Sequence, residues 1–242
     1  MGYYSKLLIA MVYSLLVCVP VSARDKPPVG TMISAQALPH DDDVQGYQEF
    51  FLDDPANDEF RAVYRSVDGR PIAHKRLRYS GTEKHPTFEM HDYRNASGYR
   101  VVPMSQRLRV ERLKLLENNI QAVVDVQEVI IVEPTVIDAS FHRFLMEQWS
   151  VVERGEVIKF NFLQLDKARL VPMELKRTDC SSADLLCVRI TLSNFFYRAF
   201  VPPVLLTYEK STRRLLHYSG YGPLPTEAGR ALPVTLDYRY VN

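Results

Sequence analysis

Apolar and polar residues alternate at every second position through most of this chain, a period that is typical of β-strands with one buried face. The final run shows it most clearly, with Val234, Leu236 and Tyr238 on one side and Thr235 and Asp237 on the other. Similar segments predict strands at residues 47–52, 60–65, 72–79, 87–93, 99–102, 108–116, 121–132, 157–163, 170–177, 187–192, 205–209 and 214–218. The range 108–116 also suits a helix, although its alternation favours a strand. We expect a mainly β fold, a curled antiparallel sheet that forms a barrel or a half-barrel.

One segment, residues 138–154, departs from this pattern and follows the 3.6-residue period of a helix. Its large apolar side chains fall on one face, and Gly155 stands where a left-handed residue would end the helix. The sheet offers a surface for that face to cover. We therefore expect one principal amphipathic helix against the concave face of the sheet.

Gln148 falls in the middle of the apolar face of this helix, where its amide needs a partner. It either bonds to a neighbour in a solid core, or it orients a ligand in a cavity that the helix lines. The candidate ligand-binding residues under the second interpretation are Phe141, Phe144, Leu145, Gln148, Trp149 and Tyr197.

Residues 194–206 crowd aromatic side chains into one short segment, in which Pro202 and Pro203 oppose a regular central strand. A short helix capped by Asn194 is one expectation. The segment either plugs one end of the barrel or forms an apolar lip that contacts lipid or a partner. The residues of the candidate lip are Phe195, Phe196 and Phe200.

The first 45 residues lack the strand period. Residues 1–23 combine Lys6, an apolar run and the small residues before Arg24, which indicates a signal peptide, with an uncleaved anchor as the alternative. Residues 24–45 hold several prolines and the acidic run 41–43, and we interpret them as a flexible linker. Residues 46–242 then form a single β-rich domain, which we expect in the periplasm or outside the cell.

Export changes the expectation for the two cysteines that remain, Cys180 and Cys187. In an oxidising compartment a disulfide is the expected state, and their spacing would join the two arms of a turn. A metal pair is the alternative, but a second Cys or His pair at suitable spacing is missing from the sequence.

The net charge and the sequence motifs limit which partners, metals and reactions can be expected. Without residues 1–23 the chain loses one of its 30 Lys and Arg and none of its 29 Asp and Glu, so its net charge is zero and nucleic acid is not expected as a partner. Glu89 and His91 alternate on one strand, with His85 before them, and could hold a metal, but an exposed polar strand face is the ordinary interpretation and the one we favour. We expect no metal, no cofactor and no catalytic residue, because the sequence contains no nucleotide-binding, hydrolase or metalloprotease motif.

Three segments resemble an uncharacterised group of exported proteins from Gram-negative bacteria. They are VIDASFHRFLMEQW (136–149), GEVIKFNF (155–162) and LLTYEKSTRRLLHYSGYG (205–222). The resemblance covers roughly residues 60–241 and implies no established activity. At the level of fold, a curled sheet with an inner helix is also similar to periplasmic lipoprotein carriers and lipocalin-like barrels.

Two hypotheses about function follow. The first is non-catalytic periplasmic binding of an apolar or amphipathic, lipid-like ligand in envelope maintenance. The second is a ligand-free envelope protein with a filled barrel that acts through interaction or structure. A ligand-sized cavity beneath the helix would favour the first, and a polar cleft that gathers His85, Glu89 and His91 would favour a hydrolase instead.

Overall fold

The computed structural model describes residues 33–40, 45–54, 58–80, 84–116, 121–227 and 229–240, so the expected signal peptide lies outside the described residues. These ranges contain β1 (Ile33–Pro39), β2 (Tyr47–Asp54), β3 (Glu59–Ser66), β4 (Pro71–Arg78), β5 (Thr87–Asp92), β6 (Ser97–Met104), β7 (Arg107–Leu115), β8 (Gln121–Ile130), β9 (Thr135–Val136), β10 (Ile158–Gln164), β11 (Arg169–Thr178), β12 (Leu185–Leu192), β13 (Val204–Glu209), β14 (Leu215–Tyr221) and β15 (Pro233–Tyr240). The helical segments are η3 (Asp138–Ser140), α1 (Phe141–Glu147), α2 (Trp149–Glu153), η4 (Leu165–Lys167) and α3 (Phe195–Arg198). None of these helices is long and apolar enough to cross a membrane.

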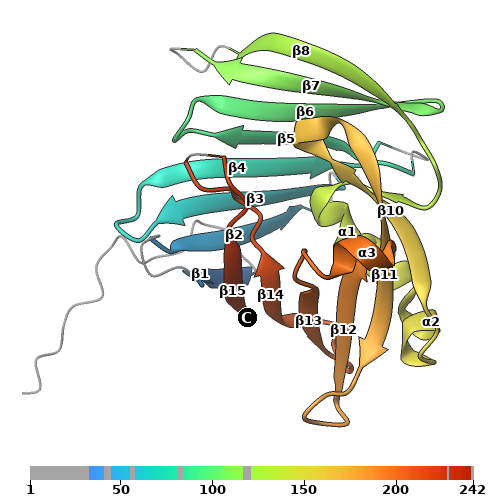
Figure 1. Cartoon of the computed structure of the whole chain (residues 1–242). Helices are drawn as coiled ribbons and strands as arrows, with labels where there is room; N and C mark the ends of the chain where they lie inside the picture. Colours follow the sequence, from blue (N-terminus) through green and yellow to red (C-terminus); the bar gives the residue numbers. More distant parts are fainter. Residues whose placement is uncertain are drawn as a thin grey trace, which may run out of the picture.

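All the strands belong to one curled, unclosed sheet (Figure 1). Its order runs from β8 through β7 down to β2 and β1, then through β15 down to β9. Neighbours pair antiparallel except for β9 and β10, which are parallel. The expected fold class is therefore confirmed, and each range that the sequence predicted as a strand contains one.

The prediction that residues 24–45 form a flexible linker is wrong for residues 33–39. Residues Ile33–Pro39 form β1, which pairs with β15 on one side and β2 on the other. Ala35 and Ala37 are buried, with 7% and 0% exposure. Alanine is a weak signal for a buried strand, and one of the two partner strands, β15, lies far away in sequence, so the local pattern missed β1. Gly46 follows at a close approach, where an added Cβ would lie 2.5 Å from Ala37 O.

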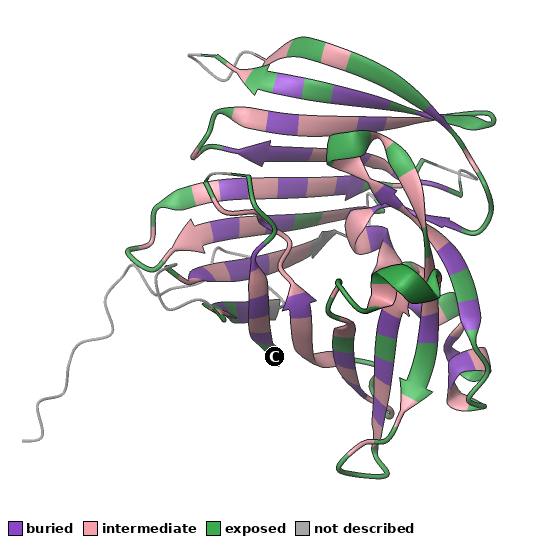
Figure 2. Cartoon of the chain, viewed as in Figure 1, coloured by how far each residue is buried: buried purple, intermediate pink, exposed green. Residues whose placement is uncertain are grey.

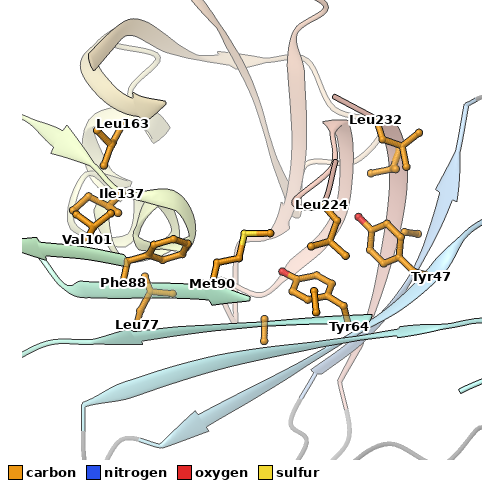
Figure 3. Packing of buried hydrophobic residues seen from close by; sticks show 14 of the residues in the cluster. Tyr47, Tyr64, Leu77, Phe88, Met90, Val101, Ile137, Leu163, Leu224 and Leu232 are labelled. Atoms are coloured by element: carbon orange, nitrogen blue, oxygen red, sulfur yellow. The ribbon is translucent and has the colours of Figure 1, made fainter. Parts of the chain in front are cut away.

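The buried residues along the inner face of the sheet form two adjoining clusters. Figure 2 shows where buried positions recur along the strands, and Figure 3 shows residues of the first cluster. The first spans β1 to β8, β10 and β15 and includes Tyr47, Tyr64 and Phe88. Leu224 and Leu232, from the connection between β14 and β15, reach into this cluster and are 0% and 4% exposed. The connection between β14 and β15 therefore covers the first cluster. Residues 194–206, the candidate plug, do not take this role.

The second cluster joins the helix to β10–β13. Leu145, Trp149 and Val152 are 0%, 3% and 0% exposed and pack with residues of the same inner face. The helix is not continuous: Gln148 separates α1 from α2, with φ −96° and ψ 7°. Its N–H still bonds to Phe144 O, at 3.1 Å, which keeps the two segments in line. Gly155 ends the run with φ +82°, as expected.

The turn between β11 and β12 carries the expected disulfide, Cys180–Cys187. Because β11 and β12 already pair from Met173 to Thr178, the bond closes the turn end of a hairpin rather than joining distant parts of the chain. Its stabilising effect is limited accordingly, since the closed loop is short.

Trp149→Ala should lower the free energy of unfolding by about 3–5 kcal/mol, because a fully buried aromatic side chain leaves a cavity at the junction of α2 and the sheet. Urea denaturation followed by circular dichroism measures this. Phe195→Ala is the matched control, since Phe195 is 78% exposed and its removal should change stability by less than about 0.5 kcal/mol. A near-native midpoint for the Trp149 variant would contradict the packing described above.

Candidate functional site

The candidate ligand-binding residues do not form one group. Leu145 and Trp149 belong to a packed core, in which the Trp149 ring meets Tyr208 edge to face at 5.8 Å. Phe141 and Phe144 are half-buried against Phe160, with ring centroids 5.7 and 5.3 Å away. The helix therefore covers the sheet in the way that a core helix does.

Two members of the set lie elsewhere. Gln148 is half-buried at the break between α1 and α2. Tyr197 lies on α3 and is 63% exposed. Arg198 from α3 bonds to Glu174, whose strand neighbour Leu175 points into the core, so α3 lies on the opposite face of the sheet from α1 and α2.

Two hollows stand out in the described part of the chain, and residues of α1 and α2 line neither of them. The larger, about 700 Å³, opens to solvent where β6 and β7 meet the end of β8. His85 and Glu133 face each other there, with 3.0 Å between Nε2 and Oε1. The smaller, about 10 Å³, lies between η4 and the inner face of β6–β8.

The three histidines near β5 lie in two separate places. Glu89 and His91 meet on the outer face of β5 at 2.8 Å, and His74 from β4 packs against His91 with ring centroids 4.5 Å apart. His85 instead pairs with Glu133, so the polar cleft of His85, Glu89 and His91 does not form. Among the described residues no group of three His, Cys, Asp or Glu could hold a metal ion.

A polar cluster that sequence reasoning missed lies on the inner face. Lys75 from β4 is 2% exposed and reaches both carboxylate oxygens of Asp138, at 2.7 and 2.9 Å. Asp138 adopts a left-handed conformation, φ +44°, at the start of η3. A buried ion pair of this kind fixes where the helix begins relative to β4, because either charge alone would be costly to bury.

Glu49 from β2 adjoins this ion pair and is 2% exposed. Burial raises the pKa of its carboxyl to about 7, and Asp138 adds to the rise, while a hydrogen bond from Tyr64 and the charge of Lys75 oppose it. Glu49 Oε2 and the hydroxyl of Tyr47 have no hydrogen-bond partner among the described residues. This cluster can therefore hold a proton inside the sheet at neutral pH. The sequence showed only a polar residue at an inward-facing strand position.

The aromatic segment after β12 is the most exposed apolar feature of the described part of the chain. Of the 11 phenylalanines, the three that are exposed all fall here: Phe195, Phe196 and Phe200, at 78%, 78% and 81%. The segment is held firmly, since Asn194 caps α3 by accepting from Phe196 N–H at 3.0 Å. Arg198 anchors it further by donating to Glu174 at 2.5 Å. These residues present the geometry of a lip rather than a plug.

Cations flank this aromatic segment on the outer face of β10–β12. Lys176 lies directly opposite Arg189, and Lys159 lies opposite Glu174. Glu174 already accepts a hydrogen bond from Arg198, so its negative charge is neutralised by that arginine. Lys159, Lys176 and Arg189 are all exposed. Two like charges placed directly opposite on neighbouring strands repel each other and favour an anionic contact.

Glu49→Gln tests the protonation of the interior cluster. The raised pKa means that the folded state holds the Glu49 proton more tightly than the unfolded state, so wild-type stability should fall as pH rises from 4.5 to about 7. The variant lacks this loss, so the difference in unfolding free energy should shift in its favour by about 3 kcal/mol between pH 4.5 and 8. Parallel denaturation curves across that range measure it. A constant difference would show that Glu49 does not titrate there.

Comparison with known proteins leaves the family open. No family model matches the chain, and no curated protein matches it. Among solved structures, the chain is similar to a β-barrel-like protein of domain of unknown function DUF1849 from Brucella abortus. The two share 9% identity with a TM-score of 0.40, over 88% of this chain and 97% of the other.

Proposed function

We propose that this chain is a non-catalytic, exported protein of the bacterial envelope that binds an amphipathic lipid at its surface. One observation carries the proposal: all three exposed phenylalanines lie within six residues, beside Tyr197, on a segment that is held in place. Isolated exposed apolar residues are ordinary, whereas a contiguous aromatic patch indicates an interaction surface.

The energetics suit a reversible contact. Burying one phenylalanine side chain is worth about 1.5–3 kcal/mol, so three give about 5–9 kcal/mol before the cost of association. Aromatic rings partition well into the interface of a bilayer, where Tyr197 can keep its hydroxyl in water. Such a segment fits the boundary between headgroups and acyl chains.

The flanking cations favour an anionic lipid. Lys159, Lys176 and Arg189 lie on the outer face of the strands next to α3, and each basic residue near an anionic membrane contributes about 1 kcal/mol. The disulfide and the expected signal peptide are consistent with a protein that works outside the cytoplasm, where such a surface is available.

A second candidate is the ligand-free envelope protein with a filled interior. The packing of Leu145, Trp149 and Val152 against β10–β13 favours it over a ligand held beneath the helix. In that case the aromatic segment would bind a protein rather than a lipid.

The aromatic patch is tested by the triple variant Phe195→Ser, Phe196→Ser, Phe200→Ser. Vesicles that contain phosphatidylglycerol should sediment the wild type and at least tenfold less of the variant, while the melting temperature stays unchanged. Val124→Ser, Val126→Ser, Ile130→Ser is the matched control, because it removes three apolar side chains that are 55%, 45% and 65% exposed on β8. Equal binding by both triple variants, or none by the wild type, would refute the lipid contact.

Gln148→Leu separates a surface ligand from one beneath the helix. Gln148 lies on the face of the sheet opposite α3, so titration with a fatty acid should give the same affinity for variant and wild type. Stability should stay level or rise by up to about 1 kcal/mol, since Gln148 is half-buried and leucine would place more apolar surface against its apolar neighbours. Weaker fatty-acid binding by this variant would instead place the ligand at Gln148, beside Phe141 and Phe144.

A further inference from the structure

The outer face of β3 and β4 carries an arginine cluster that the proposed function does not use. In the strand register Arg61 lies directly opposite Arg76, and Arg78 lies opposite Glu59. Cross-strand neighbours of like charge repel each other, so a pair of arginines at this position needs a reason or a counter-charge.

Glu59 supplies the counter-charge. Its side chain is 2% exposed and lies among three guanidinium groups. Arg61 donates to Oε1, Arg76 donates to Oε2 at 2.7 Å, and Arg78 donates to Oε2 at 2.9 Å through Nη2 and at 3.1 Å through Nε. Burial of the carboxyl opposes ionisation, but the hydrogen bonds from the arginines outweigh it and lower the pKa of Glu59 to about 2. One fixed negative charge thus gathers three positive ones at a single place.

Glu59 carries one negative charge against three positive ones, and no second carboxylate among the described side chains forms an ion pair with these arginines. The next acid along the row, Glu89, lies opposite Arg76 but bonds to His91 at 2.8 Å and to Gln121 at 3.1 Å. It also forms an ion pair with Arg100, at 3.6 Å. Among the described side chains of this cluster, a surplus of two positive charges therefore remains.

The arginines keep donors free for a ligand. A guanidinium carries five N–H donors in a planar fork, and only part of each fork meets Glu59. The side chains of Arg61, Arg76 and Arg78 are 51%, 43% and 52% exposed, so the remaining donors reach solvent. Because Glu59 restrains all three, little side-chain entropy is lost when they bind an anion.

We propose that Glu59 organises Arg61, Arg76 and Arg78 into a binding site for an oxyanion of the phosphate class. The phosphate dianion matches the surplus of two charges, and its oxygens match the planar, paired donors of arginine. The site lies on β3 and β4, away from the aromatic segment after β12, and does not rest on the lipid contact proposed above. The phosphoryl group could be free in solution or belong to a lipid headgroup.

Isothermal titration calorimetry with inorganic phosphate at pH 7.5 tests the site without any membrane. The wild type should bind with a saturable isotherm, and Arg61→Gln together with Arg76→Gln should weaken binding at least tenfold. This double variant leaves Glu59 paired with Arg78, and its melting curve checks that it folds. Arg107→Gln is the matched control, because Arg107 is an outer-face arginine that pairs one-to-one with Glu128 at 2.6 Å. It should bind phosphate as the wild type does.

Arg76→Lys distinguishes a built site from general attraction between charges. Lysine keeps the charge and loses the fork, so phosphate affinity should fall several-fold. Wild-type affinity in Arg76→Lys, equal weakening in Arg107→Gln, or no saturable isotherm for the wild type would each overturn the proposal.

A second titration separates the two sources of the phosphoryl group. It uses a short-chain phosphatidic acid below its critical micelle concentration, with the matching diacylglycerol as the control. Affinity above that for inorganic phosphate, still dependent on Arg61 and Arg76, assigns the site to a lipid phosphate. Equal affinity assigns it to the phosphoryl group alone.

Discussion

The pairing of β1 with β15 is the constraint on which the whole sheet depends. The order places β1–β8 on one side of this pair and β9–β15 on the other, so the ladder between Ile33 and Tyr240 joins the two halves of the sheet (Figure 1). Its partners lie at opposite ends of the chain, and closing so long a loop is entropically costly. The seven register pairs and the buried Ala35 and Ala37 supply the compensation.

With the two halves joined, the inner face becomes a continuous interior that mixes apolar packing with a few buried charges. Lys75 and Asp138 tie β4 to the start of the helical segment, and Glu49 lies beside them with a raised pKa. Such groups set position more than they add stability, because their desolvation offsets most of their attraction. The helix then packs on β10–β13 through Leu145, Trp149 and Val152, leaving its candidate ligand face inside the core.

The outer face of the sheet carries different kinds of side chain on different strands, and both proposed binding sites follow from that difference. Arginines and glutamates alternate along β3–β7, with a positive surplus around Glu59. On the β10–β12 side the cations Lys176 and Arg189 stand beside an exposed aromatic segment. The full sequence has a formal net charge of only +1, so these local surpluses, not an overall field, decide which anions the surface attracts.

The sequence alone indicated most of the strands, the helical segment and the disulfide, because a period of two, a period of 3.6 and a short cysteine spacing are local signals. It also singled out Phe195, Phe196 and Phe200, although whether they plugged the barrel or faced solvent was left open. Only the tertiary structure decided that question, together with the strand at Ile33–Pro39, the Lys75–Asp138 ion pair and the three arginines around Glu59. Each of these depends on which strands lie side by side, and strand neighbours are chosen by long-range pairing that no short stretch of sequence contains.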